Sequence, residues 1–148
     1  RHMHKIASIL LAVFAVGVHA ASPEPIYFGG TWVGKMQYKA SIASKVDQAS
    51  YAVVDFTFFI DENGGVRGSS PENGCQIAGL ASLDHYRQEK IHLDLNVSQC
   101  AHKILNTSVK GGFIIDRKTG FASMEAGIIR PIVGGLHVIE MKANLRRG

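Results

Sequence analysis

Residues 91–98 alternate strictly between apolar and polar side chains. The apolar residues are Ile91, Leu93, Leu95 and Val97, and the polar residues are His92, Asp94, Asn96 and Ser98. Successive side chains of a β-strand point to opposite faces, so a period of two predicts a strand with one buried face and one solvated face. This segment therefore belongs to a sheet that has a core on one side only.

The same period recurs along most of the chain after residue 30, and turn-forming segments such as 61–65 and 117–120 separate the repeats. No helical period is present in this part, and residues 41–50 are the only candidate for a helical turn or two. Strands are expected at 32–41, 51–60, 66–69, 75–83, 91–98, 105–116, 121–129 and 137–146. Strands joined by short turns close most simply as a small barrel or a sandwich, because closure removes exposed edges. We predict an all-β fold, an antiparallel up-and-down β-barrel of about eight strands.

The first twenty residues have the pattern of a secretory signal peptide. A basic opening leads into the apolar run 6–18, and the run ends at the small residues Val18-His19-Ala20. The run is about 13 residues long, whereas a helix needs about 20 to cross a bilayer, so a membrane anchor is the weaker interpretation. We expect cleavage after Ala20 and a periplasmic or secreted protein.

The chain divides into three segments. Residues 1–20 form the signal peptide, with Arg1-His2 ahead of Met3 interpreted as a cloning remnant. Residues 21–30 form a linker in which two prolines disfavour helix. Residues 31–148 are the length of one ordinary domain, and we expect a single β-barrel domain there.

The charge of the chain excludes nucleic acid as an expected partner. The net charge is +4, but the basic residues are scattered, and no run is longer than Arg146-Arg147. Nucleic-acid binding needs a concentrated basic stripe. The charge supports only a modest preference for acidic partners or anionic surfaces.

Two cysteines, Cys75 and Cys100, follow the signal peptide. An even pair in an exported protein most simply forms one disulfide. Two buried thiols or a reactive pair are the alternatives, although no C-x-x-C motif supports redox chemistry. A disulfide here would stabilise the fold by roughly 3 kcal/mol.

The first predicted strand opens with Gly30-Thr31-Trp32, and the last ends with Leu145-Arg146-Arg147. Together these resemble the calycins, the lipocalins and avidin-like barrels, in which Gly-x-Trp begins the first strand. The resemblance implies a small barrel in which a basic residue of the last strand, Arg146 or Arg147, packs across the Trp32 indole, and we assign this contact to Arg146. A guanidinium over an indole gains a cation–π contact of about 0.5–2 kcal/mol.

No motif of a known catalytic or metal site is present. The histidines after the signal peptide lack zinc-site spacing, no Gly-x-Ser-x-Gly appears, and the glycine pairs 111–112 and 134–135 lack the context of a phosphate cradle. Those glycines are better explained by bulges and barrel corners. The sequence predicts no catalytic residue, no metal ligand and no cofactor.

These observations favour an exported, non-catalytic binding protein. Candidate ligand-binding residues inside the barrel, for a small apolar molecule, are Trp32, Met36, Tyr38, Phe56, Phe58 and Tyr86. An eight-stranded barrel is just wide enough for side chains to fill it or for one small ligand. If side chains fill it, the loops 41–50, 70–74 and 130–135 would contact an extracytoplasmic protein, for example as an inhibitor of a secreted enzyme. A small hydrolase with an unrecognised site is the competing class.

Overall fold

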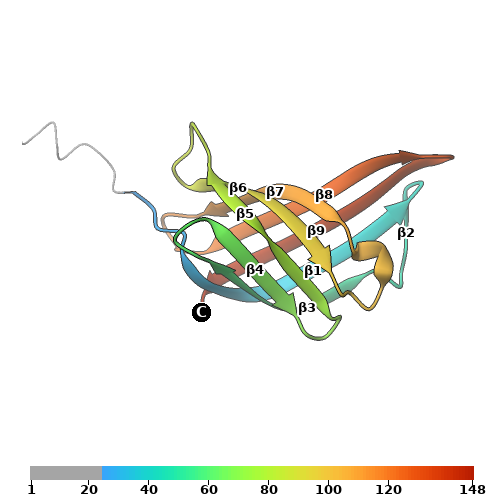
Figure 1. Cartoon of the computed structure of the whole chain (residues 1–148), viewed down its shortest axis with the longest axis horizontal. Coiled ribbons are helices and arrows are strands. Elements are labelled where there is room, and N and C mark those ends of the chain that lie inside the picture. The colour runs from blue at the N-terminus through green and yellow to red at the C-terminus, as the bar shows by residue number, and fades with distance from the viewer. Residues whose placement is uncertain (1–24) are drawn as a thin grey trace, which may run out of the picture.

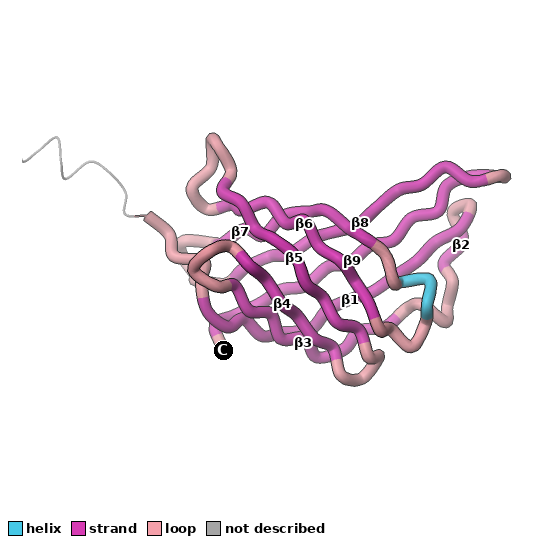
Figure 2. Tube along the Cα trace, viewed as in Figure 1, coloured by secondary structure: helices cyan, strands magenta, loops and turns pink. Residues whose placement is uncertain are grey.

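A computed structural model of the chain describes residues 25–148. The signal peptide 1–20, with its cleavage site, and residues 21–24 of the linker lie outside the described residues. Within them the chain is almost entirely strand and turn (Figure 2). The elements are β1 (Gly30–Ile42), β2 (Lys45–Val46), β3 (Ala52–Ile60), β4 (Gly65–Ser70), β5 (Cys75–Leu83), β6 (Lys90–Ser98), a 3₁₀ turn (Lys103–Leu105), β7 (Ser108–Ile115), β8 (Ala122–Ile132) and β9 (Gly135–Arg147).

The strands form a closed antiparallel barrel, which confirms the predicted fold class (Figure 1). Each long strand pairs with the next along the chain, and β9 returns to pair with β1. This last ladder runs from Trp32 opposite Arg147 to Ile42 opposite His137. The two-residue β2 adds a short extra strand at the end of β1.

The alternation of the sequence sets which side chains point inward. In β6, the four apolar residues are buried, whereas His92, Asp94 and Asn96 are exposed. The same two-residue period of burial runs through β3 and the second half of β9. All buried apolar side chains join one core, as expected when a sheet closes on itself.

Close strand packing explains one of the predicted corner glycines. A Cβ on Gly111 would overlap the Glu125 carbonyl of the neighbouring strand. Gly111 therefore lets β7 approach β8.

The connection 41–50 differs from its prediction. The expected helical turn is absent from these residues, which form β2 and two turns instead. The Ser50 hydroxyl explains the path, because it accepts a hydrogen bond from the Ala40 amide at 2.8 Å and donates one to the Asp47 carbonyl at 2.6 Å. These side-chain bonds satisfy backbone groups that a helix would have paired internally.

The segment 130–135 is also not the loop that was predicted. Strands β8 and β9 continue through it to a two-residue turn at Val133-Gly134, forming a hairpin that projects from the barrel (Figure 1). The ladder between β7 and β8 ends at Lys110 opposite Gly127, so beyond Gly127 one edge of β8 is free. Pro131 lies on this free edge, where its missing N–H costs no ladder hydrogen bond.

The disulfide prediction is confirmed, because Cys75 and Cys100 are bonded. The bond joins the start of β5 to the loop after β6, at the same end of the barrel. Within residues 25–148, no helix is long and apolar enough to span a bilayer.

Candidate functional site

Five of the six predicted interior residues do point into the barrel. Trp32, Met36, Tyr38 and Phe58 have no exposed surface, and Phe56 is 2% exposed. They pack on each other and on inward side chains from the other strands, with the Phe56 and Phe58 rings stacked at 5.7 Å between centroids. These five side chains fill the barrel interior rather than line an open space.

Phe113, which the sequence analysis did not single out, lies at the centre of the aromatic cluster. Its ring meets Trp32 edge-on at 5.0 Å and stacks on Phe58 at 6.1 Å between centroids. Phe113 follows two glycines in β7, so the sequence alone does not show which face its side chain is on. The strand register shows that the side chain points inward.

One polar pair lies within the interior. The Tyr38 hydroxyl and the Ser70 hydroxyl are 2.6 Å apart and hydrogen-bonded. Burial raises the pKa of Tyr38 to about 12, because the phenolate would be poorly solvated there, although the Ser70 hydrogen bond partly offsets the increase. The pair satisfies both hydroxyls, as buried polar groups require.

Tyr86 is the interior prediction that was wrong. It lies in the loop between β5 and β6 and is 95% exposed. Asp84 shapes this loop by accepting hydrogen bonds from the amides of Tyr86 and Arg87, at 3.0 and 2.8 Å. The strand has already ended at Leu83, so the inward direction of β5 no longer applies at position 86.

The Trp32 end of the barrel is closed as the calycin resemblance implies, but by Arg147 and not by Arg146. The Arg147 guanidinium carbon lies 4.1 Å from the Trp32 ring centroid, and the group also donates hydrogen bonds to the carbonyls of Gly29 and Tyr27. The Trp32 Nε1 donates to the Phe28 carbonyl at 2.9 Å. Arg146 has the opposite parity and lies on the outer surface.

Two histidines form pairs with carboxylates on the surface. His92 Nε2 lies 2.6 Å from Asp84, and His102 Nε2 lies 2.8 Å from Asp47. Two backbone amides, followed by the His92 hydrogen bond, lower the pKa of Asp84 to about 2. The first pair ties the β5–β6 loop to β6, and the second ties the loop after β6 to the segment after β2.

Ser82 in β5 and His92 in β6 place a hydroxyl and an imidazole on adjacent strands. Ser82 lies directly opposite His92 in the register, but its hydroxyl has no hydrogen bond to that ring. Among residues 25–148, no three His, Cys, Asp or Glu side chains are grouped to hold a metal ion.

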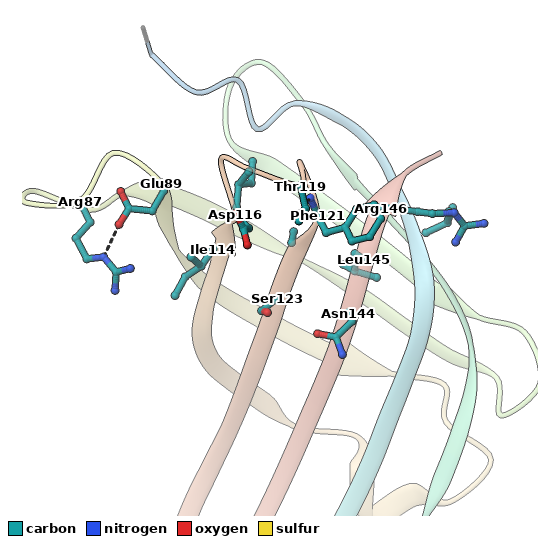
Figure 3. A pocket seen from close by; sticks show the side chains of 13 residues that line it. Arg87, Glu89, Ile114, Asp116, Thr119, Phe121, Ser123, Asn144, Leu145 and Arg146 are labelled. Carbon is teal, nitrogen blue, oxygen red and sulfur yellow. Dashed lines mark hydrogen bonds and ion pairs between the residues drawn. The ribbon is translucent and has the colours of Figure 1, made fainter. Parts of the chain in front are cut away.

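The largest hollow described lies on the outside of the barrel near the Trp32 end, and we call it the outer groove. Its volume is about 690 Å³, and β7, β8, β9 and the loops beside them contribute to it (Figure 3). Phe121, 59% exposed, and Arg146 lie at its rim, and the Arg87–Glu89 ion pair, at 2.7 Å, lies on the side of the β5–β6 loop. Sequence reasoning missed this groove because residues from four separate segments form it.

The opposite end of the barrel gathers the three predicted contact loops. Residues 41–50, 70–74 and 130–135 all lie there, together with the disulfide-bonded loop after β6. The projecting hairpin is the most apolar part of this end, with Ile129 64% and Val133 fully exposed. This end and the outer groove both expose apolar side chains that a partner could cover.

A scan of protein-family models finds no match to this chain, and searches of curated proteins and of solved structures find none either. The closed antiparallel eight-stranded barrel is consistent with a calycin-like fold.

Proposed function

We propose that this chain is an exported, non-catalytic binding protein that recognises an extracytoplasmic protein through the outside of its barrel. The observation that carries the proposal is the filled interior, where the five inward candidate residues are at most 2% exposed. Ligand pockets for small molecules usually enclose about 300–1,000 Å³, which here would require displacing several aromatic side chains. The barrel then serves as a rigid scaffold for its surface.

The outer groove is the proposed contact site. Phe121 offers an exposed aromatic side chain, and Arg146 also lines the groove. Aromatic and arginine side chains are the residues that most often dominate the energy of protein interfaces. Charges of both signs around the groove, including Arg87, Glu89 and Asp116, favour a partner with a mixed polar rim.

Export and the finer class of the barrel are part of this proposal. The disulfide supports an oxidising compartment, in agreement with the signal-peptide pattern. The Trp32–Arg147 contact supports a lipocalin- or avidin-type barrel end. A secreted enzyme that this protein inhibits is the second candidate partner, since the groove offers a preformed surface that needs little ordering on binding.

Site-specific photo-crosslinking tests the proposal. A crosslinking residue at Thr119, at the rim of the groove, should capture one protein in the exporting host, and the same residue at Gln76, on the outside of β5, should not. Phe121→Ala and Arg146→Ala should each weaken the Thr119 crosslink, because they remove exposed contacts without opening the core.

Native mass spectrometry of the exported protein supplies the contrary outcome. A small molecule retained at one copy per chain would place binding in the interior and contradict the proposal. Equal crosslinking at Thr119 and Gln76 would show that the groove has no special role.

A further inference from the structure

The projecting hairpin of β8 and β9 exposes apolar side chains on both of its faces and at its tip. Ile129, 64% exposed, and Leu136, 50% exposed, lie on the outer face, whereas Ile132, 41% exposed, lies on the inner face. Val133, in the turn, is fully exposed. A monomer in water rarely exposes such an edge, since an apolar strand with one free side invites association.

Two cationic side chains, Arg130 and Lys45, stand in one row across the base of this tip, with His137 and Ile42 between them. Arg130 in β8 is opposite His137 in β9, His137 is opposite Ile42 in β1, and Ile42 is opposite Lys45 in β2. Neighbouring strands lie about 4.8 Å apart, so the three steps from Arg130 to Lys45 make the row about 14 Å wide. The residues of the row are opposite one another in the register, so they lie at the same level along the strands. Beyond the row, residues 131–136 carry no charge.

The tip and its base carry no carboxylate that would repel an anionic surface. Residues 40–46 and 127–139 contain no Asp or Glu. The carboxylates that follow these segments in the sequence are paired, because Glu140 pairs with Lys39 at 3.0 Å and Asp47 is hydrogen-bonded to His102 at 2.8 Å. Glu125, the first carboxylate before residues 127–139, lies farther from the tip in β8. The charge at the hairpin is therefore of one sign.

From this arrangement we propose that the hairpin docks on an anionic lipid surface, with residues 131–136 in the interface and with Lys45 and Arg130, whose guanidinium also donates to the Thr107 hydroxyl, at the headgroups. The tip extends two residues, about 7 Å, past the cationic row before its turn, which matches the usual depth of about 5–10 Å for interfacial segments. A protein groove would cover one face of the hairpin and leave the other apolar face in water. A lipid interface surrounds both faces and the tip.

Vesicle binding tests this proposal directly. The chain is produced from Ala21 onward, because the closed barrel lies within residues 30–147 and the apolar leader would itself bind lipid. It should sediment with phosphatidylcholine vesicles that contain phosphatidylglycerol and much less with phosphatidylcholine alone, and added salt should weaken the binding. Lys45→Gln and Arg130→Gln should each lower binding to the anionic vesicles by about fivefold, whereas Lys118→Gln, at the opposite end, should not.

A matched pair of leucine substitutions tests how much the apolar side chains of the hairpin contribute to vesicle binding. Leu136→Asp should lower vesicle binding by about tenfold or more, whereas Leu83→Asp, an exposed leucine at the other end of the barrel, should leave it unchanged. Unchanged Trp32 emission will show that each variant keeps its core. A chain that does not distinguish the two vesicle types, or equal effects of the two leucine substitutions, would overturn the proposal.

Depth of insertion gives a second measurement. Tryptophan placed at Val133 in a Trp32→Phe background should shift its emission to the blue when anionic vesicles are added, and tryptophan placed at Thr119 should not. A blue shift with a host protein extract but none with vesicles would mean that the hairpin enters a protein cleft, and the lipid proposal would be wrong.

Discussion

Arg147 should contribute far more to stability than its neighbour Arg146, although both end the same strand. Arg147 lies over the Trp32 ring at 4.1 Å and donates to the carbonyls of Gly29 and Tyr27, which fastens the segment before β1 to the barrel end. Arg146 faces the outer groove and makes none of these contacts. Replacing each arginine with alanine therefore compares the two positions with the same substitution.

The expected cost of Arg147→Ala is at least about 2 kcal/mol. The cation–π contact accounts for about 0.5–2 kcal/mol, and a hydrogen bond from a charged group adds about 1.5 kcal/mol where it is partly buried, as at Gly29. The bond to Tyr27 is exposed and adds little. Arg146→Ala should change the free energy of unfolding by less than about 0.5 kcal/mol, as exposed substitutions usually do.

Urea unfolding, monitored by the emission of Trp32, the chain's only tryptophan, measures the free energy of unfolding of both variants. For a domain of this size, about 2 kcal/mol corresponds to a decrease in Tm of about 8 °C. Arg147→Lys should fall between the wild type and Arg147→Ala, because lysine keeps the charge but not the planar fork that reaches two carbonyls. Equal unfolding midpoints for Arg146→Ala and Arg147→Ala would refute the assignment of Arg147 to the barrel end.

Three further outcomes are expected. Replacing Cys75 and Cys100 with alanine should lower the free energy of unfolding by about 3 kcal/mol, and thiol titration of the denatured, unreduced wild type should find no free thiol. The raised pKa of Tyr38, about 12, gives stability that is fully present below pH 10 and lost as the pH rises toward 12; absorbance at the tyrosinate band should show one late-titrating tyrosine that disappears in Tyr38→Phe. The lowered pKa of Asp84, about 2, gives stability that is present above pH 4 and lost as the pH falls toward 2, and Asp84→Asn should remove that part of the acid transition measured by circular dichroism.

The alternation of apolar and polar residues predicts most of the fold, because a sheet with one buried face imposes a period of two on its sequence. The same rule would have identified the correct arginine. Inward residues of β9 are odd-numbered from Ile139 to Leu145, so position 147 continues the inward face and position 146 does not. The resemblance to calycins indicated that a basic residue closes the barrel, and parity determines which one.

The errors occurred where alternation stops or where a strand has only one partner. Tyr86 is predicted to lie on an inward face, yet the alternation of inward and outward side chains does not extend into the loop after Leu83. Pro131 and the glycines after it predict a loop, because these residues interrupt a strand that is paired on both sides. They are compatible with β8 here since its outer edge is free beyond Gly127, a tertiary fact that no local pattern records.

The outer groove and the cationic row lay beyond sequence reasoning for a different reason. Lys45 is far from Arg130 and His137 in the sequence, and only the register of four strands places the three in one row. A scan for basic clusters along the chain finds nothing at these positions. The exposed apolar tip was equally hidden, because Ile132 and Val133 resemble core residues until the hairpin is seen to leave the barrel.

The pairing of β1 with β9 has a consequence for how the chain folds. β1 ends at Ile42 and β9 begins at Gly135, so the seam closes only after nearly the whole domain has been synthesised. Until then both strands keep unpaired backbone edges, and contacts of such long sequence separation form slowly. The nascent chain is consequently exposed to aggregation throughout synthesis, and a chaperone that binds extended, apolar segments would act on it before the seam forms. Circular permutants that join residue 148 to residue 30 and open a turn elsewhere should make the seam local and fold faster, since the Gly148 amide already reaches the Thr31 carbonyl at 2.9 Å.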